Sequence, residues 1–154
     1  MQLPENIWKR RLESEYSEML KSGENFEASP DKTVYVISLR GEAFAKNGDA
    51  IEKRASHSVE ITLLRQYPYP GGIEVFWLTP IFHPNIRAED GAVCIQLVNA
   101  WSETQTVASV VKALKQMLAN PNPQSPLNQE AANYYLEHQE LAQEQPKGPR
   151  IVHL

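Results

Sequence analysis

Three strand-like segments follow one another in the first half of this chain, and short connections rather than helices join them. Residues 33–39 are rich in Val, Tyr and Ile, residues 56–64 alternate apolar and polar side chains, and residues 73–79 form an aromatic and β-branched run. Residues 41–46 continue the first segment or pair back with it, and a strong turn signal follows at residues 47–49. Because parallel strands need long crossovers, the pattern predicts an antiparallel meander of about four strands.

Helical patterns flank these strands on both sides. Residues 5–21 place apolar side chains at three- and four-residue steps, with Asn6 as a candidate N-cap. Residues 106–120 carry a continuous apolar stripe with Thr106 as their candidate N-cap, and residues 127–141 predict a second, more polar helix. A helix, a meander and further helices in this order predict an α+β domain.

Two other segments predict turns. The stretch from Gly23 to Pro30 follows the first helical pattern, and the stretch from Tyr67 to Gly72 reads Tyr-Pro-Tyr-Pro-Gly-Gly. Proline lacks a backbone N–H donor and glycine is entropically costly in regular structure. We therefore expect both stretches to connect elements rather than belong to them.

The segment from residue 80 to residue 102 has little periodicity but keeps apolar side chains throughout. Loops of this length inside compact domains are usually functional or disordered, and the apolar side chains argue against disorder. The segment contains His83-Pro84-Asn85 and the only cysteine of the chain, Cys94. A lone cysteine is ordinarily a small buried hydrophobe, but ordered irregular backbone around it favours a functional thiol.

Length and composition set the broad class of protein. A chain of 154 residues is long enough to bury a core, and we expect one domain over residues 1–145 and a short tail over residues 146–154. The formal net charge of -4 argues against nucleic-acid binding, and the lack of a long apolar run argues against a membrane span. The first residues lack a signal-peptide pattern, so we expect a cytoplasmic protein, and a nuclear location is also compatible.

The metal-binding residue types are too sparse for a metal site. One cysteine rules out an intramolecular disulfide and a cysteine-rich zinc site. The four histidines, His57, His83, His138 and His153, are far apart and show no metal-ligand spacing. We therefore expect no metal and no bound cofactor, and we take a monomer as the default state.

The second half of the chain carries several motifs in a fixed order. His83-Pro84-Asn85 precedes Cys94, Trp101-Ser102 follows it, and Pro121-Asn122-Pro123-Gln124-Ser125-Pro126 follows the helix that begins near Thr106. This order and spacing resemble the ubiquitin-conjugating enzyme family, over roughly residues 5–140. The chain departs from the family pattern because eleven positions separate His83 from Cys94, one more than is common, and Gly71-Gly72 replaces a pair of prolines.

The resemblance implies a chemistry for these residues. Cys94 would accept ubiquitin or a ubiquitin-like protein as a thioester from an activating enzyme, which itself uses ATP, and pass it to a substrate lysine. Asn85 would donate its amide to the oxyanion of lysine attack, or would order the loop, and both uses suit an amide. His83 is expected to bond loop backbone, Pro84 to fix the turn, and Ser125 to position the lysine or to serve only as a turn residue.

The resemblance also implies surfaces for protein partners. Lys9, Arg10 and Arg11 on the first helix would meet the activating enzyme, or would form only a solvated polar face. Tyr69 and Ser102, on two loops, would meet a ligase, with Tyr69 as the aromatic anchor. Two alternatives are a non-catalytic ubiquitin-binding module of the same fold and an unrelated domain with a buried thiol.

Overall fold

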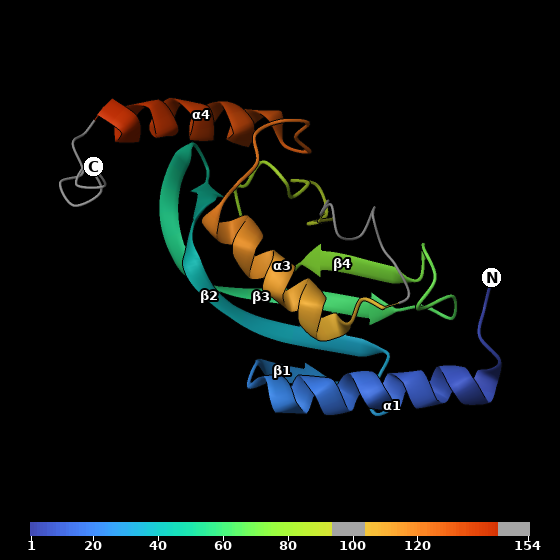
Figure 1. Cartoon of the computed structure of the whole chain (residues 1–154). Helices are drawn as coiled ribbons and strands as arrows, with labels where there is room; N and C mark the ends of the chain where they lie inside the picture. The colour runs from blue at the N-terminus through green and yellow to red at the C-terminus, as the bar shows by residue number, and fades with distance from the viewer. Residues whose placement is uncertain (94–103, 145–154) are drawn as a thin grey trace, which may run out of the picture.

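The computed structural model describes residues 1–93 and 104–144, which form a curved sheet with helices around it (Figure 1). The four strands make one antiparallel sheet in the order β1-β2-β3-β4, so the predicted α+β fold with an antiparallel meander is confirmed. In chain order the elements are α1 (Glu5–Ser22), β1 (Asn25–Ala28), β2 (Val34–Asn47), β3 (Ala50–Leu63), β4 (Ile73–Trp77), α3 (Val107–Ala119) and α4 (Gln129–Glu144).

The β2–β3 pair is a long hairpin that curves away from the rest of the sheet (Figure 1). Its strands pair from Val34 opposite Thr62 to Asn47 opposite Ala50, with a register shift between Arg40 and Ala43. Residues 41–46 therefore continue the first strand, and β3 begins six residues before the predicted start. The charged residues at the beginning of β3 hid it from the sequence pattern, because alternation is the signal for a strand.

Two local predictions are wrong. The stretch from Gly23 to Pro30 is not only a turn, because Asn25–Ala28 forms the edge strand β1, which pairs with β2. A strand of four residues is too short to show a period in the sequence. Asn6 does not cap α1, because the N-cap is Pro4, whose carbonyl accepts the N–H groups of Ile7 and Trp8.

The main core lies between α3 and the sheet, and α1 packs along one edge (Figure 1). The apolar stripe predicted for residues 106–120 is confirmed, and Thr106 caps α3 through a reciprocal capping box with Ser109. On α1, Leu12 and Met19 are buried, whereas Leu20 is exposed. The buried residues of α3 are Val107, Val110, Val111, Leu114, Met117 and Leu118.

A second, smaller apolar cluster joins α4 to the far end of the β2–β3 hairpin. The ring of Phe44 meets the rings of Tyr134 and Tyr135 edge-on, with centroids 5.3 Å and 5.5 Å apart. Lys46 on β2 also pairs with Glu130 on α4 at 2.7 Å. This cluster matters for function because it contains Phe82 and therefore fixes the backbone just before His83. Its members are Phe82, Ala131 and Tyr135, with Phe44, Ile51 and Tyr134 packed against them.

Candidate active site

His83 is a fully buried side chain that holds the turn in which it lies. Its Nε2 lies 3.1 Å from the carbonyl oxygen of Met117 in α3, and its Nδ1 accepts the backbone N–H of Asn85 at 3.0 Å. Burial lowers the pKa of His83 to about 4, so the ring is neutral near pH 7. A neutral imidazole donates through one nitrogen and accepts through the other, so these bonds place the proton on Nε2. Backbone groups therefore engage both ring nitrogens.

Asn85 makes reciprocal hydrogen bonds with the backbone of Asn122. Its Nδ2 donates to the carbonyl oxygen of Asn122 at 2.8 Å, and its Oδ1 accepts the N–H of Asn122 at 2.9 Å. A primary amide carries two N–H donors, so the bond to Asn122 uses one of them. Ordering of the loop and donation to an oxyanion are therefore compatible uses of this side chain.

Pro84 completes the connection between the turn and the loop that joins α3 to α4. Its carbonyl oxygen accepts the backbone N–H groups of Leu127 at 2.8 Å and of Asn128 at 3.2 Å. Its ring is buried. We call the contacts of His83, Pro84 and Asn85 with the segment 117–128 the turn–loop joint. Two sequence motifs, which meet at Asn85 and Asn122, 37 positions apart, thus form a single hydrogen-bonded unit.

Cys94 and Ser102 lie outside the described residues, so their predicted roles stay predictions. The chain is described up to Val93, the residue before Cys94. The backbone N–H of Val93 donates to the carbonyl of Val75 in β4 at 3.1 Å, and Val93 forms an antiparallel bridge with Ile86. Ile86 directly follows Asn85, so the approach to Cys94 is paired with the end of the turn.

Gly91 sets the path of the chain between Asn85 and Val93. It has a φ of +80°, and a Cβ atom there would lie 2.2 Å from the carbonyl oxygen of Trp77. Its own carbonyl accepts the N–H of Trp77 at 2.7 Å. Only glycine fits a left-handed conformation with backbone this close, so the return of the segment to β4 depends on this residue.

Ser125 is exposed on the loop between α3 and α4 and has a φ of 52°. The preceding loop is held by the bond from the Gln124 N–H to the Asn122 side-chain oxygen at 3.0 Å. The same Asn122 contacts Asn85, so Ser125 lies within the loop segment of the joint, three residues after the contact with Asn85. Its role toward a lysine stays a prediction.

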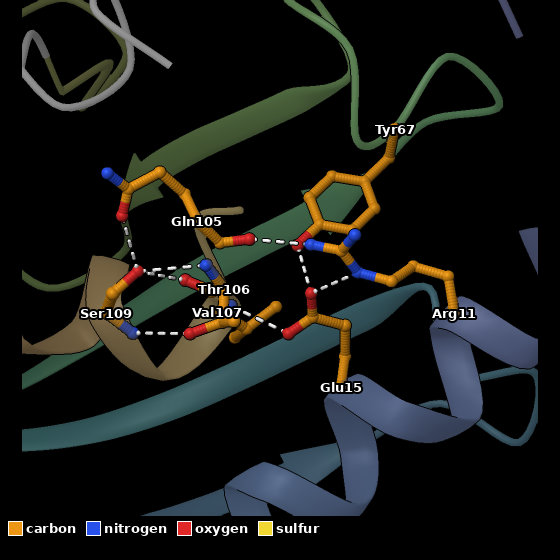
Figure 2. Close-up of polar contacts among 7 residues, drawn as sticks. All are labelled: Arg11, Glu15, Tyr67, Gln105, Thr106, Val107 and Ser109. Atoms are coloured by element: carbon orange, nitrogen blue, oxygen red, sulfur yellow. Dashed lines mark hydrogen bonds and ion pairs between the residues drawn. The ribbon is translucent and has the colours of Figure 1, made fainter. Parts of the chain in front are cut away.

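A buried carboxylate, Glu15, is a further feature that the sequence analysis missed (Figure 2). It receives hydrogen bonds from Arg11, Tyr67 and Val107, and we call these four residues the Glu15 cluster. The sequence did hold a signal: Glu15 lies three residues after Leu12 and four before Met19, on the apolar face of α1. A charge on a core-facing stripe needs partners, but the sequence does not say which.

The cations predicted to meet an activating enzyme differ in their environments. Lys9 is exposed and lies 3.2 Å from Glu5, Arg10 is exposed, and Arg11 is half-buried with its guanidinium on Glu15. The structure brings Arg10 and Arg11 together with Tyr69 around a surface hollow of about 370 Å³. Its lining residues are Leu3, Ile7, Arg10, Arg11, Ser14, Pro68 and Tyr69. Their partner roles stay predictions.

The loop that carries Tyr69 explains why glycines replace the usual pair of prolines. Gly71 has a φ of +86°, and a Cβ atom on Gly72 would lie 2.3 Å from the backbone nitrogen of Tyr67. The N–H of Gly72 also donates to the carbonyl of Tyr69 at 3.0 Å, which a proline could not do. The two glycines are therefore required by the backbone path of this loop.

In residues 1–93 and 104–144, no three histidine, cysteine or acidic side chains gather in a way that could hold a metal ion. Within the same ranges, none of the helices has the length and apolar character needed to span a membrane.

Comparison with known proteins identifies the family. A family model described as ubiquitin-conjugating enzyme matches residues 11–147, and the chain therefore belongs to the ubiquitin-conjugating enzyme family. This confirms the resemblance found in the sequence. Membership makes the protein a ubiquitin-conjugating transferase by family, and ubiquitin, activating enzymes and ligases are the partners that the family implies.

Two relatives are similar over most of the chain and a third over less than half of it. Ubiquitin conjugating enzyme E2 B of Dictyostelium discoideum is 28% identical over 126 residues, which cover 82% of this chain and 84% of that protein. Ubiquitin-conjugating enzyme E2 K of Homo sapiens is 29% identical over 140 residues, which cover 88% of this chain and 69% of that protein. Protein PEROXIN-4 of Arabidopsis thaliana is 43% identical over 68 residues, covering 43% of each chain.

Solved structures show the same fold. The E2 domain of a Toxoplasma gondii ubiquitin conjugating enzyme matches with a TM-score of 0.65 and 24% identity, covering 86% of this chain and 90% of that one. Pex4p of H. polymorpha, solved in complex with the soluble domain of Pex22p, matches with a TM-score of 0.68 and 21% identity. The match covers 87% of this chain and 90% of that one.

Proposed function

We propose that this protein carries ubiquitin or a ubiquitin-like protein as a thioester on Cys94 and transfers it to a substrate lysine with the help of a ligase. The observation that supports this most directly is the turn–loop joint. It holds Asn85 and the Ser125 loop together, and Ile86, next to Asn85, pairs with Val93, next to Cys94.

The proposed chemistry needs two acyl transfers. In the first, the Cys94 thiolate attacks the thioester on the activating enzyme, a new carbon–sulfur bond forms, and the thiolate of that enzyme leaves. In the second, a neutral lysine amine attacks the Cys94 thioester, and the oxyanion collapses to an amide as the Cys94 thiolate leaves and the amine proton passes to solvent. The Asn85 amide would stabilise that oxyanion.

His83 would support these steps without exchanging protons. Its pKa of about 4 keeps it neutral, and its bonds to Met117 and Asn85 engage both nitrogens. A thioester carrier must resist hydrolysis, and a histidine that is neutral and has both nitrogens bonded to backbone would not activate water. No bound cofactor is needed, because the activating enzyme consumes the ATP. The cytoplasmic location stays an expectation.

The partner surfaces follow from the same proposal. The exposed cations Lys9 and Arg10 on α1 would dock an activating enzyme, and the hollow beside Tyr69 would receive an apolar side chain of a ligase. A charged surface next to an apolar hollow suits two partners, an activating enzyme and a ligase, that bind transiently and one after the other.

The decisive experiment is a charging assay with ATP, a ubiquitin-activating enzyme and ubiquitin, read on non-reducing gels. We expect a thiol-sensitive adduct that is absent in Cys94→Ala and becomes thiol-resistant in Cys94→Ser. Parallel reactions use ubiquitin-like proteins with their own activating enzymes. Failure with every carrier, while a control conjugating enzyme charges, would favour the alternative of a non-catalytic ubiquitin-binding module.

The two supporting residues are tested by discharge of the preformed thioester to free lysine. We expect Asn85→Ala to slow discharge by roughly 100-fold, the usual cost of losing one oxyanion donor. For Ser125, we expect Ser125→Ala to change the rate mildly and Ser125→Asp to change it more, because the carboxylate adds charge beside the amine. Wild-type rates in both serine variants would remove Ser125 from the site.

A further inference from the structure

The carboxylate of Glu15 is the point at which three separate segments of the chain meet (Figure 2). The Glu15 side chain is only 1% exposed. Its Oε2 accepts Arg11 Nε at 3.0 Å and the hydroxyl of Tyr67, and its Oε1 accepts the backbone N–H of Val107 at 2.9 Å. The donors come from α1, from the loop after β3 and from the first residue of α3.

Each of these contacts satisfies a group that needs a partner. The first N–H groups of a helix have no partner within the helix, and the positive end of its dipole favours a carboxylate. Arg11 extends the contact through Nη2, which donates to the carbonyl of Gln105 at 2.7 Å. A buried charge is tolerated only where its hydrogen bonds are made, so the three segments depend on one another.

The cluster adjoins the surface hollow, because Arg11 belongs to both. Tyr67 precedes Pro68 and Tyr69, which line one wall of the hollow, and Arg11 belongs to the opposite wall on α1. The guanidinium of Arg11 also lies 5.3 Å from the centre of the Tyr67 ring. The relative position of the two walls is therefore set by contacts to Glu15.

We propose that Glu15 is a positioning residue that holds Arg11 and its part of α1 against the Tyr67 loop and the start of α3, so that the α1 surface is in place for the docking of an activating enzyme. This inference rests on the proposed function, because it names how the docking surface of that function is held. Weakening the cluster loosens the Tyr67 loop and the start of α3 together, although they lie about 40 positions apart in the sequence.

The first test is amide hydrogen exchange measured by NMR. Tyr67→Phe removes only a hydroxyl, and Glu15→Gln keeps the shape of the side chain. We expect each to speed exchange of the Val107 amide about fivefold, the effect of one ordinary hydrogen bond on a local opening. Tyr135→Phe is the matched control, because it removes a hydroxyl bonded to the Phe82 carbonyl and should leave the Val107 amide unchanged.

The second test uses a ubiquitin-activating enzyme and ubiquitin. In Glu15→Gln we expect the KM for this protein as substrate to rise about threefold or more while kcat stays within about twofold, the pattern of lost docking. A purely structural role would leave KM unchanged well below the unfolding temperature. The Arg10→Ala variant should raise KM without changing exchange at Val107.

Three results separate the possible failures. Unchanged Val107 exchange in both variants, or equal acceleration across the β2–β3 hairpin, overturns the positioning role. Faster Val107 exchange with unchanged KM overturns its link to docking. A wild-type protein that ubiquitin cannot charge counts against the proposed function, and the exchange data still decide whether Glu15 positions the three segments.

Discussion

The turn–loop joint and the Glu15 cluster both connect distant parts of the chain, but they do so with different chemistry. The joint uses neutral groups: an imidazole, an amide and backbone N–H and carbonyl groups. The Glu15 cluster is built on a buried carboxylate and a guanidinium. The joint lies beside the segment that leads to Cys94, and the Glu15 cluster adjoins the hollow that Arg11 helps to line.

The difference has consequences for each region. Neutral hydrogen bonds contribute modestly one by one, so the joint should lose stability in small steps. A buried charge keeps its desolvation cost when a partner is lost, so the cluster should fail abruptly. The joint also contains His83, whose pKa is lowered by burial to about 4, so acid should act on this region. Variants in each region therefore test whether the two regions respond differently.

Glu15→Ala should have the largest effect. It leaves three donors, the half-buried Arg11 guanidinium, the Tyr67 hydroxyl and the Val107 N–H, without their acceptor. Each unsatisfied buried group costs about 1–3 kcal/mol, so we expect a total loss of about 3–5 kcal/mol. Urea denaturation measures this loss. Glu13→Ala, an exposed glutamate on the same helix, is the control and should change stability by less than about 0.5 kcal/mol. A similarly small loss of unfolding free energy in both variants would show that the cluster does not fail abruptly when its carboxylate is removed.

Acid should weaken the joint through His83. Its folded-state pKa is about 4 and its ordinary value is 6.5, so the unfolded chain binds more protons between these values. The contribution of His83 to the free energy of unfolding is therefore fully present above pH 6.5. It falls as the pH is lowered through 4, by roughly 3 kcal/mol in total. His57, whose pKa burial also lowers, acts in the same direction.

Urea denaturation of wild type and His83→Gln from pH 7 to pH 4 checks this effect. The variant should be less stable at pH 7 but should lose less stability as the pH falls. Parallel pH dependences in the two proteins would exclude His83 as the source of the acid sensitivity.

Asn85→Ala should cost less than Glu15→Ala. It removes two neutral bonds to the Asn122 backbone, and we expect about 2 kcal/mol. The comparison variant is Asn6→Ala, because Asn6 is exposed and does not cap α1, and it should change stability by less than about 0.5 kcal/mol. A loss for Asn85→Ala as large as that for Glu15→Ala would remove the distinction between neutral and charged contacts.

Lys9→Ala should have the smallest effect on stability. Its ion pair with Glu5 is exposed, and such pairs contribute about 0–1 kcal/mol. Thermal unfolding at low and high salt measures the difference. The same variant should raise the KM for an activating enzyme if α1 is the docking helix, so its effect should appear in binding and not in folding.

Much of the fold could be predicted because its elements have strong local patterns. The stripe of α3 repeats at helical period over more than three turns, and Thr106 is a cap residue at its start. β1 and the first half of β3 could not be predicted. Four residues show no period, and the charged start of β3 is held by pairing with β2 rather than by its own pattern.

The site was predictable in its residues and not in its contacts. His83-Pro84-Asn85 and the Pro121–Pro126 stretch stand out in the sequence as motifs. Their connection through Asn122, Leu127 and Asn128 is a matter of tertiary distance. Glu15 was missed because a single acidic residue on an apolar helix face gives no indication of which distant donors surround it.

The sequence alone thus determined the class of fold, the family and the residues that carry its motifs, because these depend on local periodicity and on the order of residue types. Only the tertiary structure decided which groups are buried and which donors meet them. In the folded chain a neutral His83 hydrogen-bonds to α3, and Asn85 hydrogen-bonds to the backbone of Asn122. Glu15 accepts hydrogen bonds from three segments. Burial and the distances between remote segments determine protonation and hydrogen bonding, and the local sequence specifies neither burial nor these distances.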